Sequence, residues 1–333
     1  MFDTTFGSGI AKEFFDRQKA LKPLMITQEN LLEKYRDIIP DFFTVQCIDN
    51  IEESFMRELN AALPDADLII GFGGGMSIDG AKYIAWQRSK PCALVPTAIS
   101  VDACYSYPIA LRENSVVVYK GEVIPQDIIV DYEIIRSAPA VLNLSGVGDV
   151  LSCYTALFDW RLMSDAGKGV KIVDRQYNGA QRLLDDMLAN QAEIRKMSDK
   201  GIELIMNAYK WVGTEGFNCR YCHFEEGSEH YLAYTVESVC AKHLLHGRLV
   251  CMCAYIMSKL QSEGRQRVVA DFTNAIGLSI NPEAVGLTYA ELEQALRKVN
   301  SFAYDNKLSY SVLNEKTVSE QFISEVIGEL KEI

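Results

Sequence analysis

The sequence predicts two domains: an α/β domain with a parallel sheet over residues 1–138, and an all-α domain over residues 139–333. Three observations predict this class. Short apolar runs alternate with amphipathic stretches through the first part of the chain. Eight of the nine prolines lie at or before Pro139, and only Pro282 follows. Beyond Pro139 the sequence is rich in helix formers, with apolar residues every three or four positions. We therefore place the domain boundary near residues 136–140.

In the first domain, apolar runs mark the strands and amphipathic stretches mark the helices. Strands are expected at residues 24–27, 43–48, 68–72, 92–95 and 128–130, and helices at 10–20, 29–36, 51–63 and 76–88. A hairpin is expected over residues 116–124, turning at Lys120-Gly121. The alternation predicts a parallel sheet with helices on both faces. Helices of the second domain are expected at residues 145–163, 170–210, 228–262, 264–277, 289–304 and 317–331.

Composition narrows the class of protein. The chain has 333 residues, 48% of them hydrophobic, and a net charge of −12. Such a charge argues against nucleic acid or an anionic membrane surface as the main partner. The sequence has no run of eighteen apolar residues and no secretory signal at its start, so we expect no transmembrane helix. Nine scattered cysteines suit reduced thiols in the cytoplasm rather than a disulfide framework.

The stretch from Gly71 to Lys82 is the centre of the first domain. It follows the apolar run at residues 67–70 and reads Gly-Phe-Gly-Gly-Gly-Met-Ser-Ile-Asp-Gly-Ala-Lys. Glycines let the backbone turn sharply and approach a ligand, and the N–H groups that begin the next helix suit a pyrophosphate. Ser77 and Asp79 fall in the first helical turn, where they can cap the helix or reach a ribose. The pattern predicts a Rossmann-like nucleotide-binding sheet, although Met76 replaces the third glycine of the common fingerprint. A tight turn without a ligand is the alternative.

The four histidines are His223, His230, His243 and His246, all within 24 residues of the helical domain. This clustering favours a metal site, and Asp149, which follows two glycines in Gly146-Val147-Gly148-Asp149 at a helix start, is a candidate third ligand. Cys219-x-x-Cys222-His223 resembles half of a zinc site, but no second pair with suitable spacing follows. We interpret these cysteines as packed thiols.

Two further groups are ambiguous. The segment Pro96 to Asp102 follows a strand, so its polar side chains lie at the carboxyl end of the sheet, where ligands bind. An Asx or Ser turn that closes the strand is the alternative. Glu225, Glu226 and Glu229 crowd around His230. They are either ligands or a solvated acidic loop, and we favour the loop.

Taken together, five motifs resemble those of the iron-containing alcohol dehydrogenase superfamily. Within it they are most similar to the sn-glycerol-1-phosphate dehydrogenases, with the glycerol dehydrogenases next. The resemblance covers residues 7–270 and implies a dehydroquinate synthase-like fold that binds NAD or NADP and one divalent metal in the cleft between the domains. Zinc is the expected metal, with nickel or iron as alternatives. The motifs are Gly-Gly-Gly-Met-Ser-Ile-Asp-Gly-Ala-Lys (73–82), Pro-Thr-Ala-Ile-Ser-x-Asp (96–102), Gly-Val-Gly-Asp-Val-Leu-Ser (146–152), Gly-Ser-Glu-His (227–230) and His-Gly (246–247).

The resemblance implies a role for each matching residue. The pyrophosphate and the neighbouring ribose would lie on Gly73, Gly74, Gly75 and Asp79, with Ser77 in the same helical turn. The nicotinamide half would contact Thr97 and Ser100. Asp102 would bind substrate hydroxyls, and Asp149, His230 and His246 would bind the metal. These four residues form the expected catalytic set.

The chain departs from the family pattern at two places. Phosphate-using members read Ser-His-Asp where this chain has Ser100-Val101-Asp102. Many members carry an acid after the first strand, and this chain offers Gln28. An uncharged residue repels a 2′-phosphate less than an acid, which makes NADP acceptable.

These residues predict a metal-dependent oxidoreductase that moves a hydride between NAD(P) and a small polyol, with sn-glycerol 1-phosphate and dihydroxyacetone phosphate as the expected pair. A glycerol dehydrogenase acting on an unphosphorylated polyol is one alternative. A sugar-phosphate cyclase of the 3-dehydroquinate synthase type is another, although those enzymes use a glutamate as first metal ligand. A non-catalytic nucleotide-binding module is the third. We expect a cytoplasmic homo-oligomer without nucleic-acid or membrane partners.

One geometric conflict follows from these expectations. A straight helix from His230 to His246 would separate their Cα atoms by about 24 Å. Two histidines on one metal need ring nitrogens about 3–4 Å apart. Since the resemblance requires a shared metal, we predict that the helix stops near Cys240–His243. His246 should then begin a new helix, and His243 should lie in the turn as a non-ligand.

Overall fold

The computed structural model describes residues 1–113, 116–242 and 244–333. The chain divides into two compact units. One holds residues 1–143 together with 209–217, and the other holds residues 144–208 and 218–333. The first unit therefore recruits a piece of a helix from the later part of the chain.

The first unit is built on a six-stranded sheet in the order β1-β8-β5-β4-β2-β3, and every neighbouring pair is parallel. This confirms the predicted parallel sheet. The sequence analysis missed the edge strand β1, whose residues Thr-Thr-Phe-Gly lack an apolar run and which forms by pairing with β8. The strands are β1 (Thr4–Gly7), β2 (Pro23–Thr27), β3 (Thr44–Cys47), β4 (Leu68–Gly73), β5 (Cys92–Pro96) and β8 (Asp127–Asp131).

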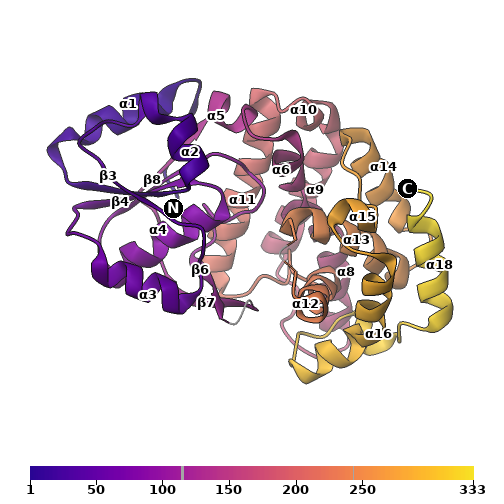
Figure 1. The fold of residues 1–333 in the computed structure, drawn as a ribbon. Helices are drawn as coiled ribbons and strands as arrows, with labels where there is room; N and C mark the ends of the chain where they lie inside the picture. Colours follow the sequence, from indigo (N-terminus) through magenta and orange to yellow (C-terminus); the bar gives the residue numbers. More distant parts are fainter. Residues whose placement is uncertain (114–115, 243) are drawn as a thin grey trace. The chain divides into compact units, whose positions relative to one another are not determined.

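Helices cover both faces of this sheet, with α1 and α2 on one face and α3 and α4 on the other (Figure 1). Neighbouring residues of β2 show the alternation: Met25 packs in the core beside α1, and Ile26 lies near Gly80 of α4. On the α1 face, Phe15 and Phe72 meet edge to face with ring centroids 5.6 Å apart. The helices are α1 (Ile10–Asp16), η1 (Arg17–Ala20), α2 (Glu29–Lys34), η2 (Arg36–Ile38), α3 (Glu53–Ala62), α4 (Gly75–Arg88) and α5 (Tyr132–Arg136).

The predicted hairpin at residues 116–124 is wrong in its position. Residues 116–122 form one strand, β7 (Val116–Glu122), which pairs antiparallel with β6 (Pro108–Glu113). The residues that join the two strands, 114–115, lie outside the described part of the chain. Gly121, the predicted turn, lies inside β7 with φ of +75°, where a Cβ would be 2.3 Å from the ring of Trp86. Its conformational freedom serves packing against α4 rather than chain reversal.

The second unit is helical in its described residues (Figure 1). Helix α13 is buried along almost its whole length and packs against α7, α8, α12 and α14. The predicted helix at residues 170–210 is divided into α9, α10 and the start of α11. The helices in this part of the chain are α6 (Ala140–Ser145), α7 (Gly148–Leu151), α8 (Cys153–Asp165), α9 (Asp174–Ala189), α10 (Gln191–Arg195), α11 (Asp199–Cys219), α12 (Ser228–Cys240), α13 (His246–Gln261), α14 (Gln266–Ile276), α15 (Pro282–Val285), α16 (Tyr289–Asp305), α17 (Val312–Glu315) and α18 (Glu320–Leu330).

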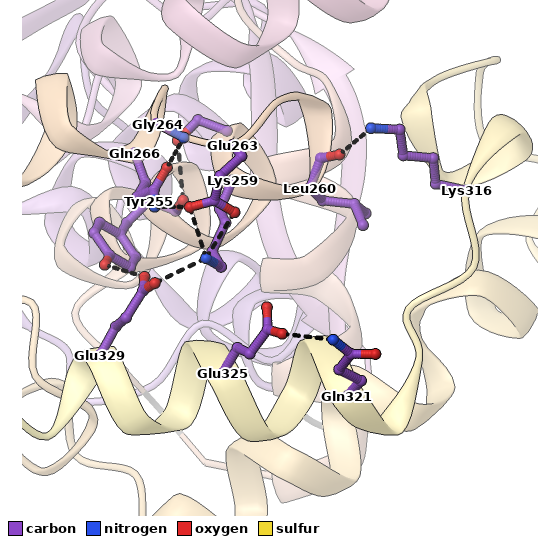
Figure 2. A network of polar contacts seen from close by, with 11 residues as sticks. Tyr255, Lys259, Leu260, Glu263, Gly264, Gln266, Lys316, Gln321, Glu325 and Glu329 are labelled. Carbon is purple, nitrogen blue, oxygen red and sulfur yellow. Dashed lines mark hydrogen bonds and ion pairs between the residues drawn. The ribbon is translucent and has the colours of Figure 1, made fainter.

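A polar network ties the C-terminal end of α13 to the last part of the chain (Figure 2). The Lys259 ammonium donates to Glu263 at 2.9 Å and to Glu329 of α18 at 2.8 Å. Glu329 also accepts from the Tyr255 hydroxyl. Lys316 donates to the carbonyl oxygen of Leu260 at 2.8 Å and so satisfies a carbonyl at the end of α13. These contacts fix the C-terminal end of α13.

One apolar stretch, Ala140–Asp165, is long and hydrophobic enough to span a membrane by length and composition. In the structure, 78% of the most apolar 18-residue segment of this stretch is buried inside the protein. A core helix of a globular protein passes the same test, so this feature is weak support for a membrane span.

Candidate metal centre and nucleotide site

The chain breaks its helix between His230 and His246, as predicted. Helix α12 ends at Cys240, and Ala241 follows in the left-handed conformation with φ of 48°. His246 is the first residue of α13. His243, predicted as a non-ligand in the turn, lies outside the described residues.

The break brings three candidate ligands together within the second unit. Each of these residues offers one ligand atom, and the three atoms lie within 4.8 Å of one another. The residues are Asp149, His230 and His246. His246 Nε2 is 3.6 Å from Asp149 Oδ1, and the two imidazole centroids are 5.6 Å apart. Asp149 and His230 are buried, whereas the His246 side chain is 30% exposed. Two imidazoles and one carboxylate fit zinc and related divalent metals, and three protein ligands leave a coordination position open.

Carboxylates behind His230 set its electrostatics. His230 Nδ1 lies 2.9 Å from Glu229 Oε1, which also accepts from the backbone N–H of Gly227 at 2.6 Å. Burial by itself would lower the pKa of His230, but the hydrogen bond to Glu229 and the nearby acids raise it to about 9. Glu225 and Glu229 are buried. The interpretation of this segment as a solvated acidic loop is therefore wrong for these two residues.

Asp159 of α8 supports the same helix start. Its Oδ2 accepts from the backbone N–H of Ser228, and its Oδ1 accepts from that of Val312, both at 2.8 Å. Burial, followed by repulsion from Glu229, raises the pKa of Asp159 to about 7. The sequence analysis missed this residue because it lies inside a helical pattern with no motif around it.

The first unit carries the glycine turn between β4 and α4. A Cβ on Gly73 would lie 2.4 Å from Ser77 Oγ, and one on Gly75 would lie 3.2 Å from Val101 Cγ2. A Cβ on Gly74 would meet nothing within 4 Å. Ser77 Oγ is buried and has no hydrogen-bond partner among the residues that the structure describes. The start of α4, which no side chain caps, and the open side at Gly74 fit a pyrophosphate.

The loop after β5 lies beside this turn. The N–H of Thr97 donates to the carbonyl of Gly73 at 3.0 Å, so the structure brings Thr97 to the glycines. Thr97 is buried, and Ser100 and Asp102 are partly exposed in the same loop. Asn143 Oδ1 accepts from the N–H of Ile99, and the Tyr209 hydroxyl donates to the Ile99 carbonyl. These two distant residues, which the sequence analysis missed, hold the loop in place.

Asp79, predicted to contact the cofactor, pairs with a buried lysine in the structure. Its Oδ1 lies 3.0 Å from the Lys82 ammonium, and the Lys82 side chain is fully buried. Lys82 also donates to the carbonyl oxygens of Ala103 and Pro108. The i,i+3 spacing on α4 allows this pairing, which anchors the loop and β6 to the helix. Gly73, Gly74, Gly75, Ser77, Thr97, Ser100 and Asp102 lie in the first unit, and Asp149, His230 and His246 lie in the second.

The Cys219-x-x-Cys222-His223 segment packs through other contacts. Cys219 Sγ donates to the carbonyl of Tyr221 at 3.1 Å. The His223 ring stacks on Tyr221 with centroids 5.2 Å apart. Burial lowers the pKa of His223, which keeps this ring neutral. These contacts agree with the interpretation as packed thiols.

Comparison with known proteins shows what the chain is similar to. The family model described as iron-containing alcohol dehydrogenase matches residues 11–139. A Thermoplasma acidophilum protein named glycerol-1-phosphate dehydrogenase, NAD(P)+, is 29% identical over 254 residues, covering 76% of this chain and 71% of that protein. A Pyrobaculum islandicum protein of the same name is 26% identical over 307 residues, covering 90% and 86%. The family model and the named relatives agree with the resemblance to the iron-containing alcohol dehydrogenase superfamily.

Solved structures with similar folds cover nearly the whole chain. Glycerol dehydrogenase from Schizosaccharomyces pombe superposes with a TM-score of 0.76 at 19% identity, covering 100% of this chain and 91% of that chain. A probable glycerol dehydrogenase from Sinorhizobium meliloti gives a TM-score of 0.73 at 18% identity, covering 99% and 98%. At such low identity these structures establish the fold alone.

Proposed function

We propose that this chain is an NAD(P)-linked, metal-dependent oxidoreductase that interconverts sn-glycerol 1-phosphate and dihydroxyacetone phosphate. The observation that carries the proposal is the grouping of Asp149, His230 and His246 within 4.8 Å. The names of the curated relatives support the substrate pair. The same grouping argues against a non-catalytic nucleotide-binding module, which has no need of a metal.

The chain's own residues have four tasks in this proposal. Asp149, His230 and His246 hold a divalent metal, and Gly74 with the start of α4 holds the pyrophosphate. Thr97 and Ser100 orient the nicotinamide, and Asp102 binds substrate hydroxyls. When bound, the metal supplies Lewis acidity and the nicotinamide supplies the hydride chemistry. Because Glu229 engages Nδ1 of His230, that imidazole has only Nε2 left as a ligand atom.

An unphosphorylated polyol is the second candidate substrate. Phosphate-using members carry histidine at the position of Val101, and the Val101 side chain packs beside Gly75. Such an apolar side chain donates no hydrogen bond to a phosphate. The cyclase alternative is less favoured, because Asp149 stands where cyclases place glutamate and the curated relatives are dehydrogenases.

A substrate comparison tests the proposal. Purified, zinc-loaded protein is assayed for reduction of dihydroxyacetone phosphate and dihydroxyacetone, each with NADH and NADPH, and for oxidation of the two enantiomers of glycerol phosphate and of glycerol. We expect the highest kcat/KM with dihydroxyacetone phosphate, oxidation of the sn-1 enantiomer only, and loss of activity on chelation that zinc restores. Equal or faster reduction of dihydroxyacetone would instead identify a glycerol dehydrogenase. Activity that resists complete removal of metal would reject the metal centre.

We also propose a cytoplasmic homo-oligomer that uses no nucleic acid. All nine cysteines are free thiols, which suits a reducing compartment. The net charge of −12 disfavours binding to nucleic acid. Light scattering during size-exclusion chromatography tests the oligomeric state, and a monomer mass would reject that part.

A further inference from the structure

We propose that Glu229 is a positioning residue of the metal centre: its carboxylate accepts the Nδ1–H of His230 and so reserves Nε2 for the metal. This inference rests on the proposed function, because it assumes that Asp149, His230 and His246 bind a metal. It assigns a role to a buried acid outside the three ligands.

The position of the Glu229 carboxylate is well defined. Oε1 lies 2.9 Å from His230 Nδ1 and accepts from the N–H of Gly227 at 2.6 Å. Glu229 is 0% exposed. A backbone N–H thus holds the oxygen that faces the imidazole, and the side chain has no solvent into which it can turn. The contact therefore selects one orientation of the His230 ring.

Capping of α12 does not by itself explain an acid at this place. Asp159 already accepts from the N–H of Ser228 at the same helix start. Glu229 Oε2 is buried and has no hydrogen-bond partner among the described residues. Burying an ionised carboxylate is costly unless positive charge lies close by. A metal cation on the other side of His230 supplies that charge, and metal-binding histidines commonly donate their second N–H to a carboxylate.

The close packing around Gly227 prevents the carboxylate from moving away. A Cβ on Gly227 would lie 2.8 Å from the Cα of Ala156, 2.8 Å from Asp159 Oδ2 and 3.1 Å from Glu229 Oε2. The two acids therefore both approach the space that a side chain at Gly227 would need. Asp159 accepts from backbone N–H groups, whereas Glu229 contacts the imidazole as well as the N–H of Gly227. This difference separates a structural role from a positioning role.

Zinc affinity of matched variants tests the proposal. Glu229→Leu removes the acceptor, Glu229→Gln keeps an acceptor oxygen without the charge, and Asp159→Asn disturbs the same helix start without touching His230. Zinc binding to each metal-free protein is measured by competition with a chromophoric chelator, and thermal unfolding reports folding. We expect about 10–100-fold weaker zinc binding for Glu229→Leu, a smaller loss for Glu229→Gln, and a change within about threefold for Asp159→Asn.

A second readout reports the tautomer directly. In zinc-loaded protein with ¹⁵N-labelled histidine, the wild type should show His230 protonated at Nδ1 alone, assigned by loss of its signal in His230→Ala. Glu229→Leu should lose this single tautomer. Unchanged zinc affinity in a folded Glu229→Leu, or an equal loss in Asp159→Asn, would overturn the positioning role while leaving the metal centre in place. Failure of the wild type to bind zinc would instead reject the metal centre, and the positioning role with it.

Discussion

Gly148 packs directly against the backbone of Gly247: a Cβ on Gly148 would lie 2.1 Å from the Gly247 carbonyl oxygen and 2.6 Å from its Cα. Gly148 precedes the candidate ligand Asp149, and Gly247 follows the candidate ligand His246. The contact joins the start of α7 to the start of α13. Two residues without side chains thus bring two ligands, far apart in the sequence, within reach of one ion.

Gly148→Ala should therefore weaken the metal centre. The added methyl group has backbone rather than a flexible side chain as its neighbour, so α7 and α13 must separate. We expect zinc content after purification to fall by more than half, with a loss of about 1–3 kcal/mol in the free energy of unfolding. Gly328→Ala in α18 is the matched control, because its Cβ would meet nothing within 4 Å. Full zinc content in a stable Gly148→Ala would contradict the role of this contact.

Gly74→Val should abolish NAD(P) binding and leave the fold intact. Gly74 has φ of −82° and ψ of −168°, an extended conformation that valine adopts, and open space at its Cβ. The side chain would occupy the space we assign to the pyrophosphate. Isothermal titration with NADH and NADPH measures the affinity, and circular dichroism checks the fold. Gly73→Val is the contrasting variant, since its Cβ would clash with Ser77 and should reduce stability itself. Cofactor affinity of Gly74→Val equal to that of the wild type would place the nucleotide elsewhere.

Gln28→Asp should shift cofactor preference towards NAD. Gln28 follows β2 directly, and β2 pairs in parallel with β4, where Ile26 is level with Gly71. Gln28 lies two residues beyond Ile26, and Gly73 lies two residues beyond Gly71. Gln28 is therefore placed beside the glycine turn. A carboxylate there would repel the 2′-phosphate of NADP and accept from the ribose hydroxyls of NAD. The ratio of kcat/KM for the two cofactors should change by about tenfold or more. An unchanged ratio would mean that other residues recognise the adenosine ribose.

Asp159 should make the second unit less stable as the pH rises. Its folded pKa, raised to about 7, lies above the value of about 3.9 for an unfolded aspartate. Between these values the native state holds a proton that the unfolded state lacks, so stability falls as the pH rises through 7. From pH 5 to pH 8 the wild type should lose about 2 kcal/mol more than Asp159→Asn. Urea unfolding of both metal-free proteins at each pH measures this. Parallel pH dependence in the two proteins would exclude the raised pKa.

Lys82→Met should destabilise the first unit strongly. Removing the ammonium leaves Asp79 buried without its cationic partner and removes donors to Ala103 and Pro108. Breaking such a buried pair costs about 3–5 kcal/mol. Lys12→Met is the control, because the Lys12–Asp16 pair is exposed and such pairs contribute less than about 1 kcal/mol. Chemical denaturation of both variants compares them. Equal effects would show that the buried pair has no special structural role.

Much of the first unit follows from local pattern. The apolar runs at residues 24–27, 68–72 and 92–95 are bounded by helices and turns, and their alternation allows little but a parallel sheet. The glycine turn is also a local property, because a side chain at Gly71 or Gly73 would crowd the residues that follow β4. The clustering of the four histidines is visible in the sequence as well. This clustering indicates residue types that suit a metal, but it does not show which side chains converge on one ion.

Tertiary structure decided which of these residues meet. Residues 228–262 have a helical period throughout, with neither glycine nor proline between His230 and His246, yet the helix ends where Ala241 adopts a left-handed conformation. The Lys82 ammonium meets Asp79 and the carbonyls of Ala103 and Pro108 together. Asp159 of α8 binds the start of α12, where Glu229 faces His230. Contacts between distant segments determine each of these outcomes. Sequence periodicity reports the face that a residue occupies on its own helix, and packing determines what lies opposite that face.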